Sequence, residues 1–263
     1  MKRMSILLLV VFILCACFVP EAWGQQPVGQ CINNWSEFHR TNMMRWNPCE
    51  KVLNVNNVGS LSLKWSYTTG NEVHGSPAAA NGVVYVGSRD DNVYALNAKT
   101  GAKLWSYTTG GYVDCSPAVA NGVVYVGSDD NNVCALNAST GAKLWSYTTG
   151  YYVFSSPAVA NGVVYVGSSD NNVYALSTKT GKKLWSYTTG NWVSSSPAVA
   201  NGVVYVGSWD FNVYALNAKT GAKLWSYTTG GHERSSPAVA NGAVYVGSRN
   251  NDVYAFGLKK GQK

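Results

Sequence analysis

Charged residues are scarce in this chain: only 13% of its 263 residues are Asp, Glu, Lys or Arg, and only three are histidines. Helix-forming residues are sparse beyond the first 25 positions, where Val, Tyr, Thr, Trp, Gly, Asn and Ser dominate. This composition predicts an all-β protein with many turns. No Ser-His-Asp order, glycine-rich phosphate loop or His-x-x-x-His spacing occurs, and no nucleic-acid recognition module is apparent. We therefore expect no nucleic-acid partner.

One long apolar run stands at the N-terminus. It covers residues 6–19, follows two basic residues, and is short for a membrane span. Ala22 and Gly24 supply small residues before a cleavage point, so residues 1–24 predict a secretory signal peptide. A second interpretation is a lipobox that makes Cys17 a lipidated N-terminus, and an uncleaved anchor is a third. We expect a secreted or periplasmic protein.

The cysteines are few and unevenly placed. Export implies an oxidising compartment, and Cys31 and Cys49 flank the non-repetitive segment 25–60, so we predict a disulfide between them. Cys115 and Cys134 fall on strands that a third strand separates by about 9–10 Å, too far for a disulfide. These two are expected to be drifted substitutions with no bridge.

A 40-residue unit recurs along most of the chain, which predicts a stacked or circular repeat fold. In the unit 111–150, four apolar runs alternate with turns, and Asn121-Gly122 suits a type I′ hairpin. Four antiparallel strands in 40 residues are typical of one propeller blade. The first strand is expected over residues 113–119, and Pro117 within it predicts a free inner edge. The repeated tryptophans are Trp65, Trp105, Trp145, Trp185 and Trp225.

The repeat is incomplete at both of its ends. The last copy begins at residue 231 and supplies three strands, whereas residues 61–70 repeat the missing fourth strand. We therefore predict that residues 61–263 form a monomeric five-bladed β-propeller of four-stranded antiparallel blades, closed by pairing of N- and C-terminal strands. Closure removes two sheet edges that favour aggregation. The alternative is an open array that closes by oligomerising.

The run ALNAKTGAKLW at residues 95–105 resembles the tryptophan-docking motif of the PQQ-like (pyrroloquinoline-quinone-type) β-propeller repeat family. The pattern recurs at residues 135–145, 175–185 and 215–225, and residues 35–38 resemble the lead-in of secreted members. The resemblance implies that each repeated tryptophan packs against the neighbouring blade.

The family contains both enzymes and scaffolds. Its quinoprotein dehydrogenases hold pyrroloquinoline quinone and Ca²⁺ on the propeller axis, but this chain lacks their adjacent Cys-Cys pair and has fewer repeats. We expect a non-catalytic binding or scaffold protein with no cofactor, no metal and a protein or carbohydrate partner. The alternatives are a quinoprotein dehydrogenase-like oxidoreductase and a cell-envelope scaffold lipoprotein of the outer-membrane-assembly type.

The copies differ in two short windows, residues 71–75 and 89–91 in the first unit and their equivalents. In an antiparallel blade both windows lie at the same end. Aromatic faces beside fixed polar groups suit a sugar, a peptide or a small aromatic ligand. The alternative is drift where packing is loosest. The candidate ligand-binding residues are Glu72, His74, Tyr112, Asp114, Tyr152, Phe154, Trp192, Trp209, Phe211, His232 and Arg234.

Other variable positions have structural interpretations. Alternation along the strand predicts that a valine column is core: Val73, Val113, Val153 and Val193. An ion pair between Arg234 and Glu72 across the closure seam is expected rather than a metal at Glu72, His74 and His232. The recurring Asp90, Asp130, Asp170 and Asp210 are expected to form turns rather than a calcium site.

Charge is polarised between the two ends. The net charge is +7 and the pI is near 9.0. The loops between the third and fourth strands carry lysines without acids, so this end suits an anionic envelope surface, or else is a solvated face that keeps the protein soluble. The lysines are Lys99, Lys103, Lys143, Lys179, Lys182, Lys183, Lys219, Lys223, Lys259 and Lys260.

Overall fold

The computed structural model describes residues 51–258, which form five antiparallel sheets. The first contains β1 (Ala78–Ala80), β2 (Val83–Gly87), β3 (Asn92–Asn97) and β4 (Lys103–Thr108). The second contains β5 (Ala118–Ala120), β6 (Val123–Gly127), β7 (Asn132–Asn137) and β8 (Lys143–Thr148). The third contains β9 (Ala158–Ala160), β10 (Val163–Gly167), β11 (Asn172–Ser177) and β12 (Lys183–Thr188). The fourth contains β13 (Ala198–Ala200), β14 (Val203–Gly207), β15 (Asn212–Asn217) and β16 (Lys223–Thr228). The fifth contains β17 (Ala238–Ala240), β18 (Ala243–Gly247) and β19 (Val253–Gly257).

The signal peptide at residues 1–24, Cys17 and the Cys31–Cys49 disulfide lie outside the described residues, so they stay predictions. Within the described part, a short 3₁₀ helix covers Val58–Ser60. No helix in residues 51–258 is long and apolar enough to cross a membrane.

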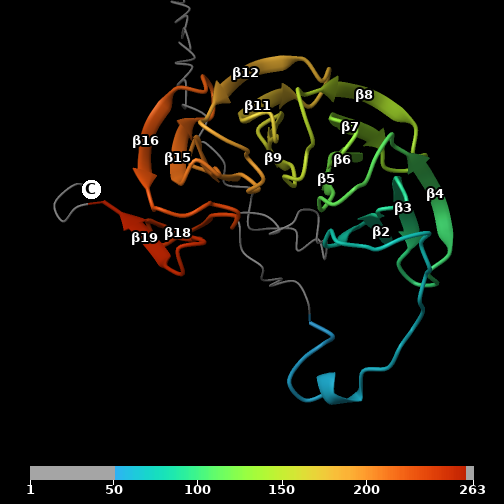
Figure 1. Ribbon diagram of the computed structural model, residues 1–263. Coiled ribbons are helices and arrows are strands. Elements are labelled where there is room, and N and C mark those ends of the chain that lie inside the picture. The colour runs from blue at the N-terminus through green and yellow to red at the C-terminus, as the bar shows by residue number, and fades with distance from the viewer. Residues whose placement is uncertain (1–50, 259–263) are drawn as a thin grey trace, which may run out of the picture.

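The five sheets are arranged like the blades of a propeller, in a ring that is incomplete (Figure 1). The first strand of each sheet lies on the inner side, where β1, β5, β9, β13 and β17 are neighbours in that order. The strands β4, β8, β12 and β16 form the outer rim (Figure 1). The predicted four-stranded unit with an inner first strand is therefore confirmed.

The hairpin turns follow from the Asn-Gly dipeptides. Asn121 has φ 51° and Gly122 has φ 76°, the positive values that a type I′ turn requires at both central positions. Asparagine tolerates this left-handed conformation and glycine adopts it freely. The same dipeptide has the same conformation in each unit, so every first hairpin has one register.

The inner strands are shorter than expected: β5 covers Ala118–Ala120 rather than residues 113–119. Two of the preceding residues bond to neighbouring sheets. Val113 donates its N–H to Ser88 in the first unit at 3.2 Å, and Ser116 donates to the Ser156 hydroxyl in the third unit at 2.9 Å. Pro117 has no N–H to contribute. These bonds connect successive sheets at the centre.

The core lies between the sheets. Trp105 on β4 is 9% exposed and packs in one cluster with Val124 and Leu136 of the second sheet. A glycine makes this approach close: a Cβ atom at Gly141, which has φ 74°, would lie 2.7 Å from the Trp105 ring. Burial of these apolar side chains stabilises each sheet against its neighbour.

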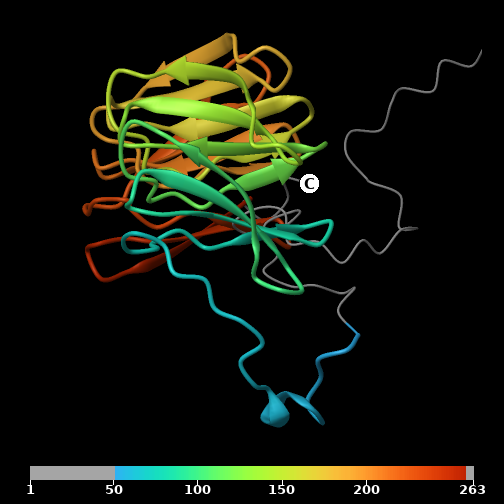
Figure 2. The ribbon, with the colours of Figure 1, turned by 90° about the vertical axis from the view of Figure 1, so that its right-hand side faces the viewer.

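The predicted closure of the ring is not seen. Residues 61–70 belong to no sheet, and β19 pairs with β18 alone among the described strands. Val253 on β19 is 81% exposed, whereas its equivalent Val213 is fully buried. Residues 51–60 extend away from the sheets in both views (Figures 1 and 2).

The N-terminal segment nevertheless packs across the first sheet. Trp65 and Tyr67 join Tyr94 and Leu96 in one cluster, and the Tyr67 and Tyr94 rings are 5.5 Å apart. Tyr147 of β8 lies at the same distance, 5.5 Å, from Tyr174 in the third sheet. The segment thus has the packing contacts of a fourth strand without its backbone pairing.

Cys115 and Cys134 are both free and buried, as the strand separation predicted. The Cys115 sulfur accepts a hydrogen bond from the Gly127 N–H at 3.1 Å, where Ser155 accepts from Gly167 in the next unit. Burial raises the pKa of each thiol to about 12, so both stay protonated at neutral pH.

Candidate binding face

The two variable windows of each unit lie at one end of the sheets. The Arg89 N–H donates to the Glu72 carbonyl at 2.9 Å, which joins the turn after β2 to the connection entering the first sheet. Asp129 makes the same bond to Tyr112, and Trp209 makes it to Trp192. We call this end the loop face. The opposite end carries the invariant turns, joined by bonds such as that from the Ala98 N–H to Gly82.

The valine column below the loop face is only partly core. Val113, Val153 and Val193 are fully buried, but Val73 is 46% exposed, so the prediction for Val73 is wrong. Each buried valine packs against a glycine of the preceding sheet, as Val113 does on Gly87. Val73 has no such neighbour in the described part of the chain, where the fifth sheet does not close onto the first.

Glu233 takes the place of valine in the fifth unit and is fully buried. Its Oε1 accepts a short hydrogen bond from the Thr229 hydroxyl, and its Oε2 has no hydrogen-bond partner among the described residues. Sequence reasoning missed Glu233, although the break in the valine column was visible. A buried carboxyl oxygen without a partner is unfavourable for folding.

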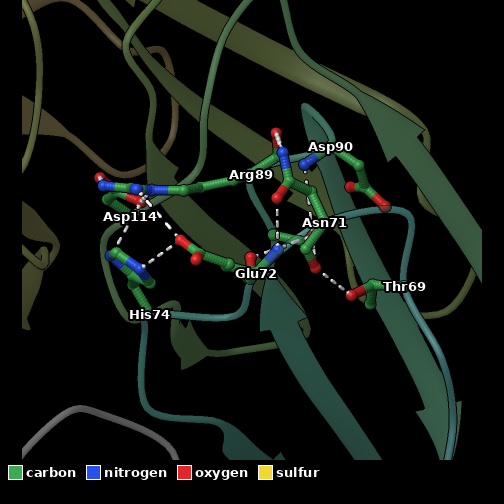
Figure 3. Close-up of polar contacts among 8 residues, drawn as sticks. Thr69, Asn71, Glu72, His74, Arg89, Asp90 and Asp114 are labelled. Carbon is green, nitrogen blue, oxygen red and sulfur yellow. Dashed lines mark hydrogen bonds and ion pairs between the residues drawn. The ribbon is translucent and has the colours of Figure 1, made fainter.

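Four of the candidate and window residues form one polar cluster at the entry to the first two sheets (Figure 3). Arg89 donates from Nε and Nη2 to the two carboxylate oxygens of Asp114, at 2.8 and 3.0 Å. Its Nη1 lies 3.2 Å from Glu72 Oε2, and His74 Nε2 lies 3.0 Å from the same oxygen. The bidentate bond to Asp114 raises the pKa of Arg89 above its ordinary value.

The expected ion pair between Arg234 and Glu72 is wrong, because Glu72 pairs with Arg89 and His74 while Arg234 is exposed on the fifth sheet. Arg89 was visible as a variable residue but was not among the candidates. Its partner lies in the next sheet, which only the packing of the sheets reveals.

Aromatic side chains form a continuous row across the third, fourth and fifth sheets. The row begins with Phe154 and Tyr152, whose ring centroids are 5.8 Å apart, and continues through Tyr151 at 4.2 Å from Tyr152. Tyr151 lies 6.2 Å from Trp192. The aromatic row therefore includes seven rings: Phe154, Tyr152, Tyr151, Trp192, Trp209, His232 and Phe211.

Hydrogen bonds hold the middle of the row. The Trp209 indole N–H donates to the Ser194 hydroxyl at 2.8 Å, and His232 Nδ1 lies 2.6 Å from the Trp209 carbonyl oxygen. Trp192 and His232 each lie 5.0 Å from Trp209, measured between ring centroids. These bonds orient the rings toward one another, with Tyr151 and Phe211 each 41% exposed at the surface.

Phe211 has φ 71°, in the left-handed region. The equivalent residues are Asp91, Asn131, Asn171 and Asn251, types that tolerate this conformation far better than phenylalanine. Phe211 is thus held against a local preference of the backbone, a feature that often marks functional positions.

Among the carboxylates of residues 51–258, Asp129 alone has a strongly raised pKa, which is about 6. Burial is the main cause, and the negative charge of Asp114 adds to it. The Asp129 Oδ1 is buried and has no hydrogen-bond partner within residues 51–258.

The recurring aspartates form turns, as predicted. Asp90 accepts hydrogen bonds from the Asn92 N–H at 3.1 Å, the Gly70 N–H at 2.6 Å and the Tyr94 hydroxyl at 2.7 Å. Burial opposes ionisation of Asp90, but these hydrogen bonds outweigh it and lower its pKa. Each such turn also connects a sheet to the segment before it.

The repeated tryptophans contact the next sheet through their indole N–H groups. Trp105 donates to the Ala138 carbonyl at 2.9 Å, and Trp65 donates to Ala98 at 3.0 Å. Trp145 and Trp185 make the equivalent bonds at 2.9 Å. Trp225 is 37% exposed and instead lies edge-on to Phe256, 4.8 Å away.

The residues present do not fit a quinone and calcium site on the axis. The inner segments bond to one another through serines, for example from the Ser156 N–H to the Ser196 hydroxyl at 3.0 Å. Nowhere in the described part do three or more His, Cys, Asp or Glu side chains gather as metal ligands. In particular, His232 packs on Trp209 rather than joining His74 and Glu72.

A family model described as "Outer membrane protein assembly factor BamB" matches residues 57–116 and 152–263. This chain belongs to the PQQ-like β-propeller repeat family. The match covers most of the repeats and agrees with the propeller-like arrangement of four-stranded sheets.

The proteins similar to this chain include quinoprotein dehydrogenases and BamB. Over 68 residues the chain is 41% identical to the quinoprotein alcohol dehydrogenase PedE of Pseudomonas putida, a match of 24% of this chain and 11% of that protein. BamB from Moraxella catarrhalis superimposes with a TM-score of 0.67 at 22% identity, covering 74% of this chain and 64% of that one. Quinohemoprotein alcohol dehydrogenase from Comamonas testosteroni gives 0.72 at 20% identity, covering 86% and 49%. These structures share the fold, and the chain spans only a small part of the dehydrogenase it matches in sequence.

Proposed function

We propose that this protein is a non-catalytic binding or scaffold module that holds a ligand or partner on its loop face. The observation that carries the proposal is the aromatic row, which joins rings from three successive sheets. Partly exposed aromatic rings beside fixed polar groups provide a large contact area at low entropic cost.

The unfavourable position of Phe211 supports this role. Packing alone does not require phenylalanine there, because the equivalent turns use Asp or Asn. Drift in a loosely packed loop tends toward tolerated residues, whereas selection for a contact surface retains a costly one.

The test is a double variant, Trp192→Ala with Trp209→Ala, in the full-length exported protein. The backbone hydrogen bond between Trp209 and Trp192 does not involve the indole rings, so the circular dichroism spectrum should be unchanged. Binding on a glycan array, and capture of a defined partner in pull-down, should be lost. The matched control, Leu184→Ala with Leu224→Ala, removes two exposed apolar side chains on the outer strands. Equal binding by the tryptophan variant and the wild type would contradict the proposal.

The ring closes, on this proposal, when residues 61–70 pair with β19 to complete the fifth sheet. The segment repeats the residues of β4, and Trp65 already contacts the first sheet as the other docking tryptophans contact theirs. The rival is an open array in which a second copy supplies the strand.

A more specific form of the proposal is a scaffold for assembly in the cell envelope. The description of the matching family model and the likeness to BamB support it. Export is part of this form, and the intact mass of the exported protein separates cleavage after Gly24 from lipidation at Cys17. A mature chain retaining residues 1–24 would contradict both.

The competing proposal is a quinoprotein-like oxidoreductase, which the relatives' names favour. Titration with pyrroloquinoline quinone and calcium, followed by absorbance and thermal shift, distinguishes the two. We expect no stoichiometric binding, since the axis offers no cluster of suitable ligands within the described residues. Tight binding would overturn the non-catalytic assignment.

A further inference from the structure

Arg89 shows how the loop face holds a cation. Its guanidinium forms two bonds with the Asp114 carboxylate, and its carbon lies 5.6 Å from the centre of the Tyr112 ring. Asp114 and Tyr112 both belong to the connection that enters the second sheet. A carboxylate and an aromatic ring from this face thus bind one guanidinium by ion pairing and cation–π attraction.

Asp129 occupies in the second unit the position that Arg89 occupies in the first. Both are held by the same backbone bond, 2.9 Å long in each case, from Arg89 to Glu72 and from Asp129 to Tyr112. The residue that corresponds to Tyr112 in the third unit is Tyr152. Here the carboxylate comes from one sheet and the ring from the next, and no ion pair within residues 51–258 places a cation between them.

The Asp129 carboxylate has no cation in direct contact, and the positive charge that acts on it is that of Arg89, which already pairs with Asp114 and Glu72. The negative charge of Asp129 contributes to the raised pKa of Tyr152, after the larger effect of the hydrogen bond with Tyr151. None of the ion pairs within residues 51–258 includes Asp129. A bound cation would compensate the desolvated carboxylate.

The charge distribution favours a cationic partner across the whole loop face. Every Asp and Glu of the described residues lies in or beside the variable windows, together with three arginines. The lysines of the described sheets lie toward the opposite end, apart from the N-terminal Lys51 and Lys64. The loop face is therefore negative, which attracts positive groups and repels acidic ones.

We propose that the loop face binds an extended basic peptide segment of a partner protein, with one Arg or Lys side chain seated between Asp129 and Tyr152. The rest of the segment lies along the aromatic row from Tyr151 toward Trp209. This inference rests on the binding role proposed above and specifies its ligand. A neutral glycan would contact the rings but would leave the Asp129 charge uncompensated.

The test uses the full-length exported protein and fluorescein-labelled hexa-arginine, with binding measured by fluorescence anisotropy at neutral pH and low salt. Asp129→Asn and Tyr152→Leu should each weaken binding by about tenfold, the size typical of a lost charge or cation–π contact. The matched control, Asp252→Asn, removes one exposed carboxylate from the same end on the fifth sheet. It should change the affinity by no more than about twofold. Labelled hexa-glutamate should not bind.

A gain-of-function variant separates a direct effect on peptide binding from an effect on folding. Ser169 is the third-unit equivalent of Asp129, and Trp192 is the fourth-unit equivalent of Tyr152. Ser169→Asp therefore builds a second carboxylate-and-ring pair, and hexa-arginine should bind more tightly. Unchanged affinity in both Asp129→Asn and Ser169→Asp would overturn the inference.

Failure of the ligand class is distinguishable from failure of the binding role. If cellohexaose binds and hexa-arginine does not, and the Trp192→Ala with Trp209→Ala variant loses cellohexaose, the basic-peptide inference is wrong while the binding face stands. If hexa-arginine, cellohexaose, every arrayed glycan and every pull-down partner behave toward the double variant as they do toward the wild type, both proposals are wrong.

Discussion

The ring of Phe211 lies 4.9 Å from the imidazole of His232 on the next sheet, and the Phe211 backbone has a φ of 71°. The contact joins the fourth sheet to the fifth at the end of the aromatic row. It exists because a bulky residue occupies a turn position where the other units have Asp or Asn.

Replacing Phe211 with asparagine should stabilise the fold. Asparagine relieves the left-handed strain, and about 1 kcal/mol of unfolding free energy should be gained, less the lost ring contact. Urea unfolding followed by tryptophan fluorescence measures the change. The reverse substitution in the third unit, Asn171→Phe, should destabilise by a similar amount. A less stable Phe211→Asn protein would show that the ring is held for packing.

Glu233→Val should also stabilise the protein. Valine is the equivalent residue in the second, third and fourth units, where it is fully buried, and it removes the buried carboxyl oxygen that has no partner. The expected gain is about 1–3 kcal/mol in thermal or urea unfolding. Val193→Glu is the reverse control and should lose stability. A destabilised Glu233→Val protein would show that the hydrogen bond from Thr229 outweighs the cost of the unpaired oxygen.

The Asp129 carboxyl predicts a pH-dependent component of stability. Its folded pKa of about 6 lies above the ordinary value of about 3.9, so the folded state holds the proton more tightly than the unfolded state. Stability from this group is present at low pH and is lost as the pH rises through about 6. The Asp129→Asn protein has no carboxyl to ionise here and does not lose this stability. The difference in unfolding free energy between the variant and the wild type should therefore grow in favour of the variant between about pH 4 and 7. Urea unfolding of both proteins at the two pH values measures it, and an equal difference at both would contradict the assignment.

Closure of the ring can be tested by a cross-strand disulfide. On the register of β15 with β16, where Tyr214 faces Ser226, residue 254 would face Ser66. Cysteine is tolerated at this position, because Cys134 occupies it in β7 opposite Ser146. Ser66→Cys with Tyr254→Cys should form an intramolecular disulfide under mild oxidation, detected by peptide mass.

The alternatives give different products. A disulfide between two chains, seen as a dimer on a non-reducing gel, would show that a second copy supplies the strand. A free pair of thiols in the oxidised protein would show that residues 61–70 do not pair with β19. The Ser66→Cys single variant controls for pairing with the native cysteines.

Much of the fold was predictable because the repeat is nearly exact in length and residue type. Asn-Gly at the first hairpin, the apolar runs of β2 and β3, and the strand order follow from local preferences that recur in each unit. The shared end of the variable windows follows from antiparallel geometry. What failed were statements about contacts between units: the seam ion pair, the burial of Val73, and the length of the inner strand.

The candidate site divides in the same way. Variation among the units located the aromatic residues, since the scaffold positions hardly differ. It did not reveal that Glu233 would be buried or that Arg89 would reach Asp114, because both depend on how one sheet faces the next. Residues 25 apart meet only when the sheets pack side by side.

By itself the sequence determined the strands, their turns and the unit they build, because these depend on backbone conformation and on side-chain alternation within about 40 residues. The tertiary structure decided which side chains meet across sheets, from the Arg89–Asp114 pair to the aromatic row. It also decided that Val253 is exposed where Val213 is buried. Burial and ion pairing depend on the separation of groups from different units, and the spacing of residues along the chain does not specify that separation.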